Sequence, residues 1–130
     1  MSLTPGLTGE AHTAVTESNT AAAVASGGIA VFATPMMIAL MEGAALSAVQ
    51  PHLAENESTV GTVLNVKHLA ATPVGMKVRA AARLEAVEGR RLLFTVEAFD
   101  DMEKIGEGTH ERYVINVERF LERVRQKGPA

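Results

Sequence analysis

The chain contains no cysteine and no tryptophan, and aromatic residues make up only 4% of its 130 positions. Without cysteine there is no disulfide, no thiolate metal site and no cysteine nucleophile, and we expect the protein to work in a reducing, cytoplasmic setting. With so few aromatic side chains, the core has to be built from Ala, Val, Leu, Ile and Met and from close approach of backbones. Such a core gains little free energy per position, which favours an oligomer.

Strong charge and long apolar runs are also missing. The formal net charge of −3 provides no long-range field that would gather nucleic acid, so no nucleic-acid partner is expected. The apolar runs fall short of the ~20 residues that span a bilayer, and the N-terminus has no basic or apolar leader, so neither membrane insertion nor export is predicted. We expect one domain over residues 1–130, with residues 1–7 as a poorly ordered N-terminal extension.

Hydrophobic patterning divides the chain into one helix and several strands. From Thr34 to Pro51 the sequence is apolar on nearly all sides, with Thr34 as a fair N-cap and Pro35 at the first helical position, which predicts a buried helix. Alternation and short turn signals predict antiparallel strands. The expected strands are 8–16, 59–70, 76–87, 90–99 and 104–117; residues 18–28 are a short helix leading into a loop or a mobile segment, and 118–127 a short helix or extended arm.

This order of elements predicts an α+β hot-dog fold, in which an antiparallel sheet of about five strands wraps around a central buried helix. Such a sheet leaves an edge strand open. Two copies commonly pair edge to edge, so we expect a homodimer, and a higher oligomer is compatible with the same argument.

Glu42 is the anomaly in the predicted helix. An ionised carboxylate among Ile38, Met41 and Leu46 costs several kcal/mol unless it is paired or faces a cleft. Glu42 therefore either faces solvent where the helix leaves the sheet, or serves as a general base or nucleophile.

His68 shares a predicted strand face with Thr62, Leu64 and Val66, which should look toward the helix. It is either a hydrogen-bonded structural residue or a partner of Glu42, across the helix–sheet interface or across a dimer interface.

Thr34 either caps the helix or donates its hydroxyl to a substrate carbonyl. It lies eight positions before Glu42, about 12 Å of helix rise, so the two cannot hydrogen-bond within one regular helix. A shared site would need an irregular helix start, a bridging substrate or two subunits.

The remaining polar residues give weaker signals. His12, His52 and His110 have no partner at metal-ligand spacing, so no metal site is expected. Residues 109–112 read as a strand segment whose charges pair across the sheet. The basic residues of 119–127 alternate with glutamates and form either a solvated face or a contact for substrate phosphates.

Several separated blocks resemble the fluoroacetyl-coenzyme A thioesterase family over roughly residues 8 to 127. These blocks are Val31–Glu42, Gly61–Thr62, His68–Pro73, Val87–Leu92, Ile105–Arg112 and Val124–Lys127. The resemblance implies a dimeric hot-dog enzyme that hydrolyses small acyl-CoA thioesters with Thr34, Glu42 and His68, and it maps substrate contacts onto Gly61 and Arg112. It implies no metal or redox cofactor.

One departure from that family concerns the acyl group. Fluoroacetate-specialised members carry two Phe residues that close over it, and the matching positions here are Ala25 and Gly28. The sequence thus predicts a short-chain acyl-CoA thioesterase with relaxed selectivity, leaving open whether Glu42 is nucleophile or general base. The alternatives are a hot-dog dehydratase or hydratase, and an acyl-CoA binding or sensing module without turnover.

Overall fold

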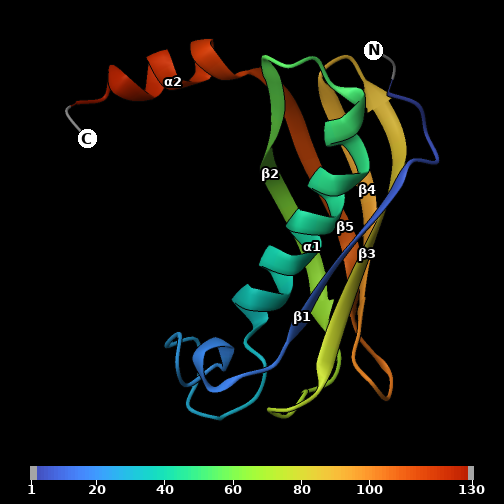
Figure 1. The fold of residues 1–130 in the computed structure, drawn as a ribbon, viewed down its shortest axis with the longest axis vertical. Helices are drawn as coiled ribbons and strands as arrows, with labels where there is room; N and C mark the ends of the chain where they lie inside the picture. Colours follow the sequence, from blue (N-terminus) through green and yellow to red (C-terminus); the bar gives the residue numbers. More distant parts are fainter. Residues whose placement is uncertain (1–2, 129–130) are drawn as a thin grey trace.

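The computed structural model describes residues 3–128. Five strands form one antiparallel sheet in the order β1-β3-β4-β5-β2. The strands are β1 (Thr8–Ala14), β2 (Glu57–His68), β3 (Lys77–Glu88), β4 (Arg91–Phe99) and β5 (Lys104–Asn116). The strands wrap around helix α1 (Thr34–Val49), as Figure 1 shows. This confirms the predicted α+β architecture.

Helix α1 packs on the sheet through small and flexible side chains. Its buried residues are Met37, Met41, Ala44, Ala45, Ala48 and Val49. The backbone of β1 lies directly on this surface, because a Cβ at Gly9 would overlap the carbonyl of Ala44. The expected close approach of backbones is therefore present, and it compensates for the scarcity of aromatic side chains.

Three shorter elements complete the fold. The 3-10 turn η1 (Glu17–Asn19) follows β1, and the 3-10 turn η2 (Gln50–His52) directly follows α1. Helix α2 (Val117–Arg125) continues from β5 and projects past β2, away from the sheet (Figure 1). None of its residues is buried, and Phe120, Leu121 and Val124 are exposed.

The predicted N-terminal extension lies partly outside the described residues. Within the described part, Gly6 donates a backbone hydrogen bond to Leu84 and Leu84 donates one to Leu7, each 2.8 Å long. Leu3 and Leu7 pack against the core. These contacts join residues 3–7 to the end of the sheet formed by β1 and β3.

A bulge interrupts β2 at the position that matters most for the site. The register with β5 shifts between Gly61 and Val63. Leu64, Val66 and His68 follow the predicted alternation and are half-buried, whereas Thr62 is exposed. The extra residue of the bulge turns Thr62 away from the face that the uninterrupted pattern predicts.

Candidate active site

Thr34 and His68 meet at the start of α1. Their Oγ1 and Nδ1 atoms are 2.7 Å apart and share a hydrogen bond. Helix α1 begins at Thr34, its N-cap is Ala33, and no side chain caps it. The expectation that Thr34 caps the helix is therefore wrong: its hydroxyl contacts the end of β2 instead.

The His68 ring is held in an apolar environment. Burial lowers the pKa of His68, and a backbone group of Ala70 near the ring opposes this more weakly. Its Nε2 atom is buried and has no hydrogen-bond partner among residues 3–128. An orphaned acceptor is more common inside proteins than an orphaned N–H. This favours the tautomer in which Nδ1–H donates to Thr34 and leaves the threonine hydroxyl hydrogen free.

A cavity of about 330 Å³ opens beside this pair. It is bounded by Thr34 and His68 together with small and apolar side chains. The other lining residues are Ala21, Ser26, Val31, Phe32, Leu69, Ala70 and Ala71. Its size and lining suit a short acyl group next to one hydroxyl and one imidazole.

Glu42 forms a second cluster, two turns further along α1. Its carboxylate lies 3.5 Å from Nη1 of Arg112, and its side chain is 39% exposed. A Cβ on Gly61 would overlap the Glu42 carboxylate and crowd Arg112 and His110. Glu42 is therefore neither simply solvent-facing nor an unpaired buried charge, because a guanidinium from β5 neutralises it.

Arg112 itself is almost completely buried. Its Nε donates to Thr59 Oγ1 at 2.7 Å, and its Nη2 donates to the Thr59 carbonyl at 2.9 Å. Burial lowers the pKa of Arg112 while Glu42 raises it. Such a guanidinium stays charged, since its ordinary pKa lies so far above neutrality.

His110 and Thr59 contact this cluster although neither was among the predicted site residues. Of the charges expected to pair across the sheet, Glu111 does so, accepting from Arg91 Nε at 2.8 Å. His110 and Arg112 point inward instead, alternating with Glu111 and continuing the buried positions of β5 through Val114. The alternation of β5 could have revealed this in the sequence, since it places His110 and Arg112 on the side of the strand that faces the helix.

The two clusters do not touch within one chain. Among the described residues, no hydrogen bond or ion pair joins Glu42 to Thr34 or His68. The helix is regular between Thr34 and Glu42, so they stay about 12 Å apart along its axis. The structure thus brings Thr34 to His68, and Glu42 to Gly61 and Arg112, as two separate groups.

Ala25 and Gly28, the positions that lack the family's two Phe residues, lie one and two residues from Ser26, which lines the cavity. Ala25 and Gly28 are both exposed. A side chain built on Gly28 would meet nothing within 4 Å, and Ala25 has a positive φ of 62°. Neither position carries a bulky side chain that could close over the cavity.

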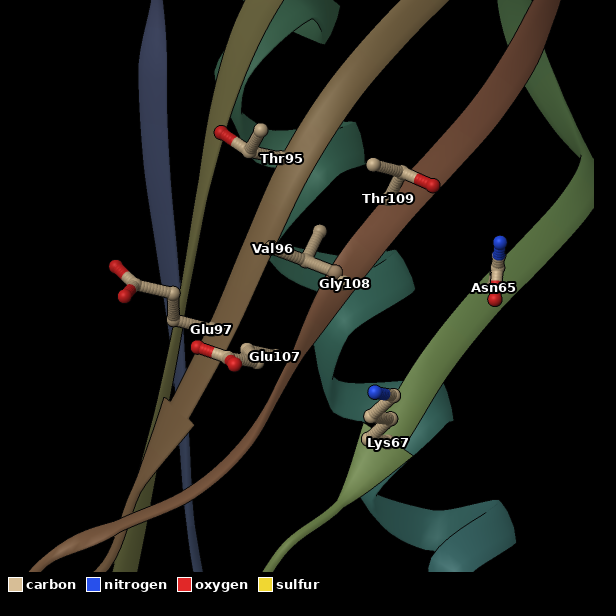
Figure 2. A pocket seen from close by; sticks show the side chains of 8 residues that line it. All are labelled: Asn65, Lys67, Thr95, Val96, Glu97, Glu107, Gly108 and Thr109. Carbon is tan, nitrogen blue, oxygen red and sulfur yellow. The ribbon is translucent and has the colours of Figure 1, made fainter.

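A different groove lies on the outer face of the sheet. It has a volume of about 590 Å³ and is lined by polar residues of β2, β4 and β5, including Lys67, Glu97 and Glu107. Figure 2 shows these side chains on the side of the strands away from α1. Lys104 pairs with both Glu97 and Glu107. None of the five predicted site residues lines this groove, so it is separate from the candidate active site.

Residues 3–128 contain neither a cluster of metal-ligating side chains nor a membrane-spanning helix. No three His, Asp or Glu side chains in this range are grouped so as to hold a metal ion. No helix in the same range is long and apolar enough to cross a bilayer.

Comparison with known proteins decides the family. Residues 15–118 match the family model described as fluoroacetyl-CoA-specific thioesterase. The chain belongs to this family. A fluoroacetyl-CoA thioesterase of Streptantibioticus cattleyicolor is 51% identical over 100 residues, covering 77% of this chain and 72% of that protein.

Solved structures of thioesterases agree with the fold. A structure of the fluoroacetyl-CoA thioesterase FlK superposes with a TM-score of 0.92 at 39% identity, covering 99% of this chain and all of that one. A Thermus thermophilus member of the thioesterase superfamily gives a TM-score of 0.86 at 30% identity, covering 97% and 96%. The chain has the hot-dog thioesterase fold, and it is an enzyme of the thioesterase class, a hydrolase of thioester bonds.

Proposed function

We propose that this enzyme hydrolyses short-chain acyl-CoA thioesters to the free acid and CoA in the cytoplasm, with relaxed selectivity for the acyl group. The observation that carries the proposal is the Thr34–His68 hydrogen bond of 2.7 Å between two residues that line a cavity of about 330 Å³. The relatives named as fluoroacetyl-CoA thioesterases support an acyl-CoA substrate.

The working unit in this proposal is a homodimer paired through β2. That strand lies at one edge of the sheet, and its residues 61–63 are exposed. An antiparallel pairing about a twofold axis between Leu64 and Asn65 puts Gly61 of one copy opposite His68 of the other, since both lie equally far from that axis. The exposed apolar face of α2 extends past the same edge (Figure 1) and would cover part of the second copy.

Such a dimer supplies a reason for the two separate clusters. Glu42, Gly61 and Arg112 of one copy approach Thr34 and His68 of the other, so each complete site spans the interface. A single chain holds only half of each site. Pairing of dimers into a larger assembly remains compatible with this arrangement.

The proposed reaction adds water across the thioester. Glu42 either attacks the carbonyl carbon, giving an anhydride that water then opens, or removes a proton from the attacking water. The free hydroxyl hydrogen of Thr34 and the amide of Gly61 donate to the developing oxyanion. The C–S bond breaks, and His68 relays a proton to the departing thiolate, so that CoA leaves as the thiol. No step requires a metal or redox cofactor.

The proposal of relaxed selectivity rests on the small, exposed residues Ala25 and Gly28. Without a ring at position 25 or 28, only the small cavity discriminates between acyl groups, and one methylene in such a pocket is worth ~1 to 3 kcal/mol. Acetyl, propionyl and butyryl esters should therefore differ by less than about 200-fold in kcat/KM, and fluoroacetyl-CoA should exceed acetyl-CoA only modestly. A fluoroacetyl preference above about 10⁴ would contradict relaxed selectivity and leave hydrolysis intact.

A panel of acyl-CoA esters assayed for free thiol tests the function. Glu42→Gln should lower kcat by at least ~100-fold while the protein stays folded and dimeric. Glu107→Gln is the matched control, because that carboxylate lies on the outer face of the sheet and should keep wild-type turnover. Wild-type protein that binds the esters and returns them uncleaved would be a binding module. Loss of enoyl absorbance without thiol release would identify a hydratase.

A further inference from the structure

His110 is a buried polar residue that the proposed chemistry does not use. It is completely inaccessible to solvent, and its ring lies 6.1 Å from the Phe94 ring, centroid to centroid. Both ring nitrogens nevertheless have partners. Nδ1 is 2.7 Å from the Val63 carbonyl, and Nε2 is 3.2 Å from Nη1 of Arg112.

The chemistry of these partners fixes the tautomer of His110. Arginine is only a donor, so Nε2 of His110 accepts from Arg112. The hydrogen therefore resides on Nδ1, which donates to the Val63 carbonyl, itself only an acceptor. Burial lowers the pKa of His110 more than the Val63 hydrogen bond raises it, which favours the neutral ring that this arrangement requires.

The same contacts leave the Arg112 guanidinium little freedom. Thr59 holds Nε and Nη2 through two hydrogen bonds, and His110 holds Nη1. Because a guanidinium is planar, these three contacts fix both its plane and its rotation in that plane. Nη1 is then directed toward the Glu42 carboxylate at 3.5 Å.

His110 also fixes the strand segment that faces Glu42. The carbonyl that accepts from Nδ1 belongs to Val63, at the bulge after Gly61. Gly61 in turn packs so closely that a Cβ there would overlap the Glu42 carboxylate and lie 3.1 Å from His110 and 3.2 Å from Arg112. One imidazole therefore bridges the bulge of β2 and the guanidinium of β5, the two surfaces between which the Glu42 carboxylate lies.

We propose that His110 is a positioning residue for thioester hydrolysis, acting through Arg112 on the Glu42 carboxylate. The role rests on the proposed function, in which Glu42 performs the chemistry. Glu42 needs such support because its side chain is 39% exposed and long enough to leave the reactive geometry by a change of rotamer. A misplacement of 1 Å costs ~10²-fold in rate.

Two substitutions separate the two bonds of His110. In His110→Gln the side-chain oxygen reaches the place of Nε2 and can still accept from Arg112, while the bond to Val63 is lost. In His110→Asn the amide nitrogen takes the place of Nδ1 and can still donate to Val63, while Arg112 loses its acceptor. We expect kcat to fall ~10- to 100-fold in His110→Asn and less than about 5-fold in His110→Gln. Thermal unfolding of each variant measures how much the substitution destabilises the fold, apart from its effect on kcat.

A double-mutant cycle with Thr59→Val provides the matched control. Thr59→Val removes the other side-chain anchor of Arg112 and should lower kcat in the same way. Because both residues act on one guanidinium, the effect of His110→Asn should be much smaller in the Thr59→Val background than in the wild type. Additive losses, or kcat values that follow the unfolding temperature rather than the retained bond, would overturn the role of His110.

The tautomer itself can be read without any variant. Nitrogen-15 NMR of the wild-type imidazoles should show His110 protonated at Nδ1, and protonation at Nε2 would refute the argument even if every substitution unfolds the protein. A wild type that releases no thiol from any ester would overturn the proposed function together with this role. A wild type that turns over, with equal rates in the Asn and Gln variants, would overturn the role of His110 alone.

Discussion

Replacing Gly61 by Ala should damage the active site while leaving the fold intact. A Cβ there would overlap the Glu42 carboxylate, whereas the atoms next nearest to it, in His110 and Arg112, would be 3.1 and 3.2 Å away. The carboxylate is the end of a flexible side chain, so it can retreat. To restore an ordinary van der Waals contact it has to move by about 1 Å, and a displacement of that size costs ~10²-fold in rate.

The stability of Gly61→Ala should change little. Gly61 lies in a strand, where Ala is favoured over Gly by roughly 0.5–1 kcal/mol of conformational entropy, and this gain offsets part of the crowding. The assay is kcat/KM for acetyl-CoA by thiol release, measured together with the free energy of unfolding in urea. We expect Gly61→Ala to lose about 100-fold in kcat/KM. Its free energy of unfolding should stay within about 1 kcal/mol of the wild-type value.

Gly43→Ala is the matched control for Gly61→Ala. Gly43 follows Glu42 on α1, and a Cβ there would meet only the Ala11 methyl at 3.8 Å, an ordinary contact. This variant should gain up to about 1 kcal/mol of stability from helix propensity and keep its activity. A Gly61→Ala enzyme that retains kcat/KM within about twofold of wild type would refute the reasoning, because Glu42 would then not need its observed position.

Three further predictions concern Thr34, His68 and Asp100. Thr34→Ser keeps the hydroxyl and should keep most activity, whereas Thr34→Val should lose ~10²-fold in kcat. Because burial lowers the pKa of His68, the acidic limb of the plot of kcat/KM against pH should have its midpoint below pH 6.5. This limb should vanish in His68→Ala. Burial raises the pKa of Asp100, but hydrogen bonds from Met102, Thr72 and Glu103 outweigh it and hold the pKa below 3.8. Asp100 therefore stabilises the fold above pH 3.8, and this stability is lost as the pH falls through its folded-state pKa. Unfolding curves of wild type and Asp100→Asn should converge below pH 3.8, and a constant difference at all pH values would contradict this.

Much of the architecture could be predicted because its signals are local. The predicted helix from Thr34 to Pro51 matches α1 at Thr34–Val49, and the strand at 76–87 matches β3 at Lys77–Glu88. Proline and the hairpin turns mark these boundaries in the sequence itself. The single apolar helix among antiparallel strands then allows few arrangements that bury it from several sides.

The errors came from contacts between distant segments. Thr34 is the first residue of α1 rather than its N-cap, and its hydroxyl bonds His68, 34 positions later. The exposure of Thr62 follows from the bulge after Gly61, and no alternation pattern in β2 alone reports a bulge, since it depends on the register with β5. Local rules fail here at the two places where the candidate site is built.

Glu42 shows how much of the candidate site could be predicted from the sequence. Its position in an apolar helix indicated that the carboxylate needs a partner or a cleft, and that inference required no structure. The partner is Arg112, 70 positions along the chain and held in place by Thr59 and His110. The other half of the predicted chemistry, Thr34 with His68, lies two helical turns away in the same chain. Because α1 is regular, a site that uses all three residues needs either a substrate that bridges the two clusters or a second copy. In the dimer we propose, the second copy brings the complementary cluster across the interface, so a variant locked as a monomer should lose turnover even though both clusters remain folded. A monomer that keeps wild-type kcat would instead favour a substrate that bridges the two clusters.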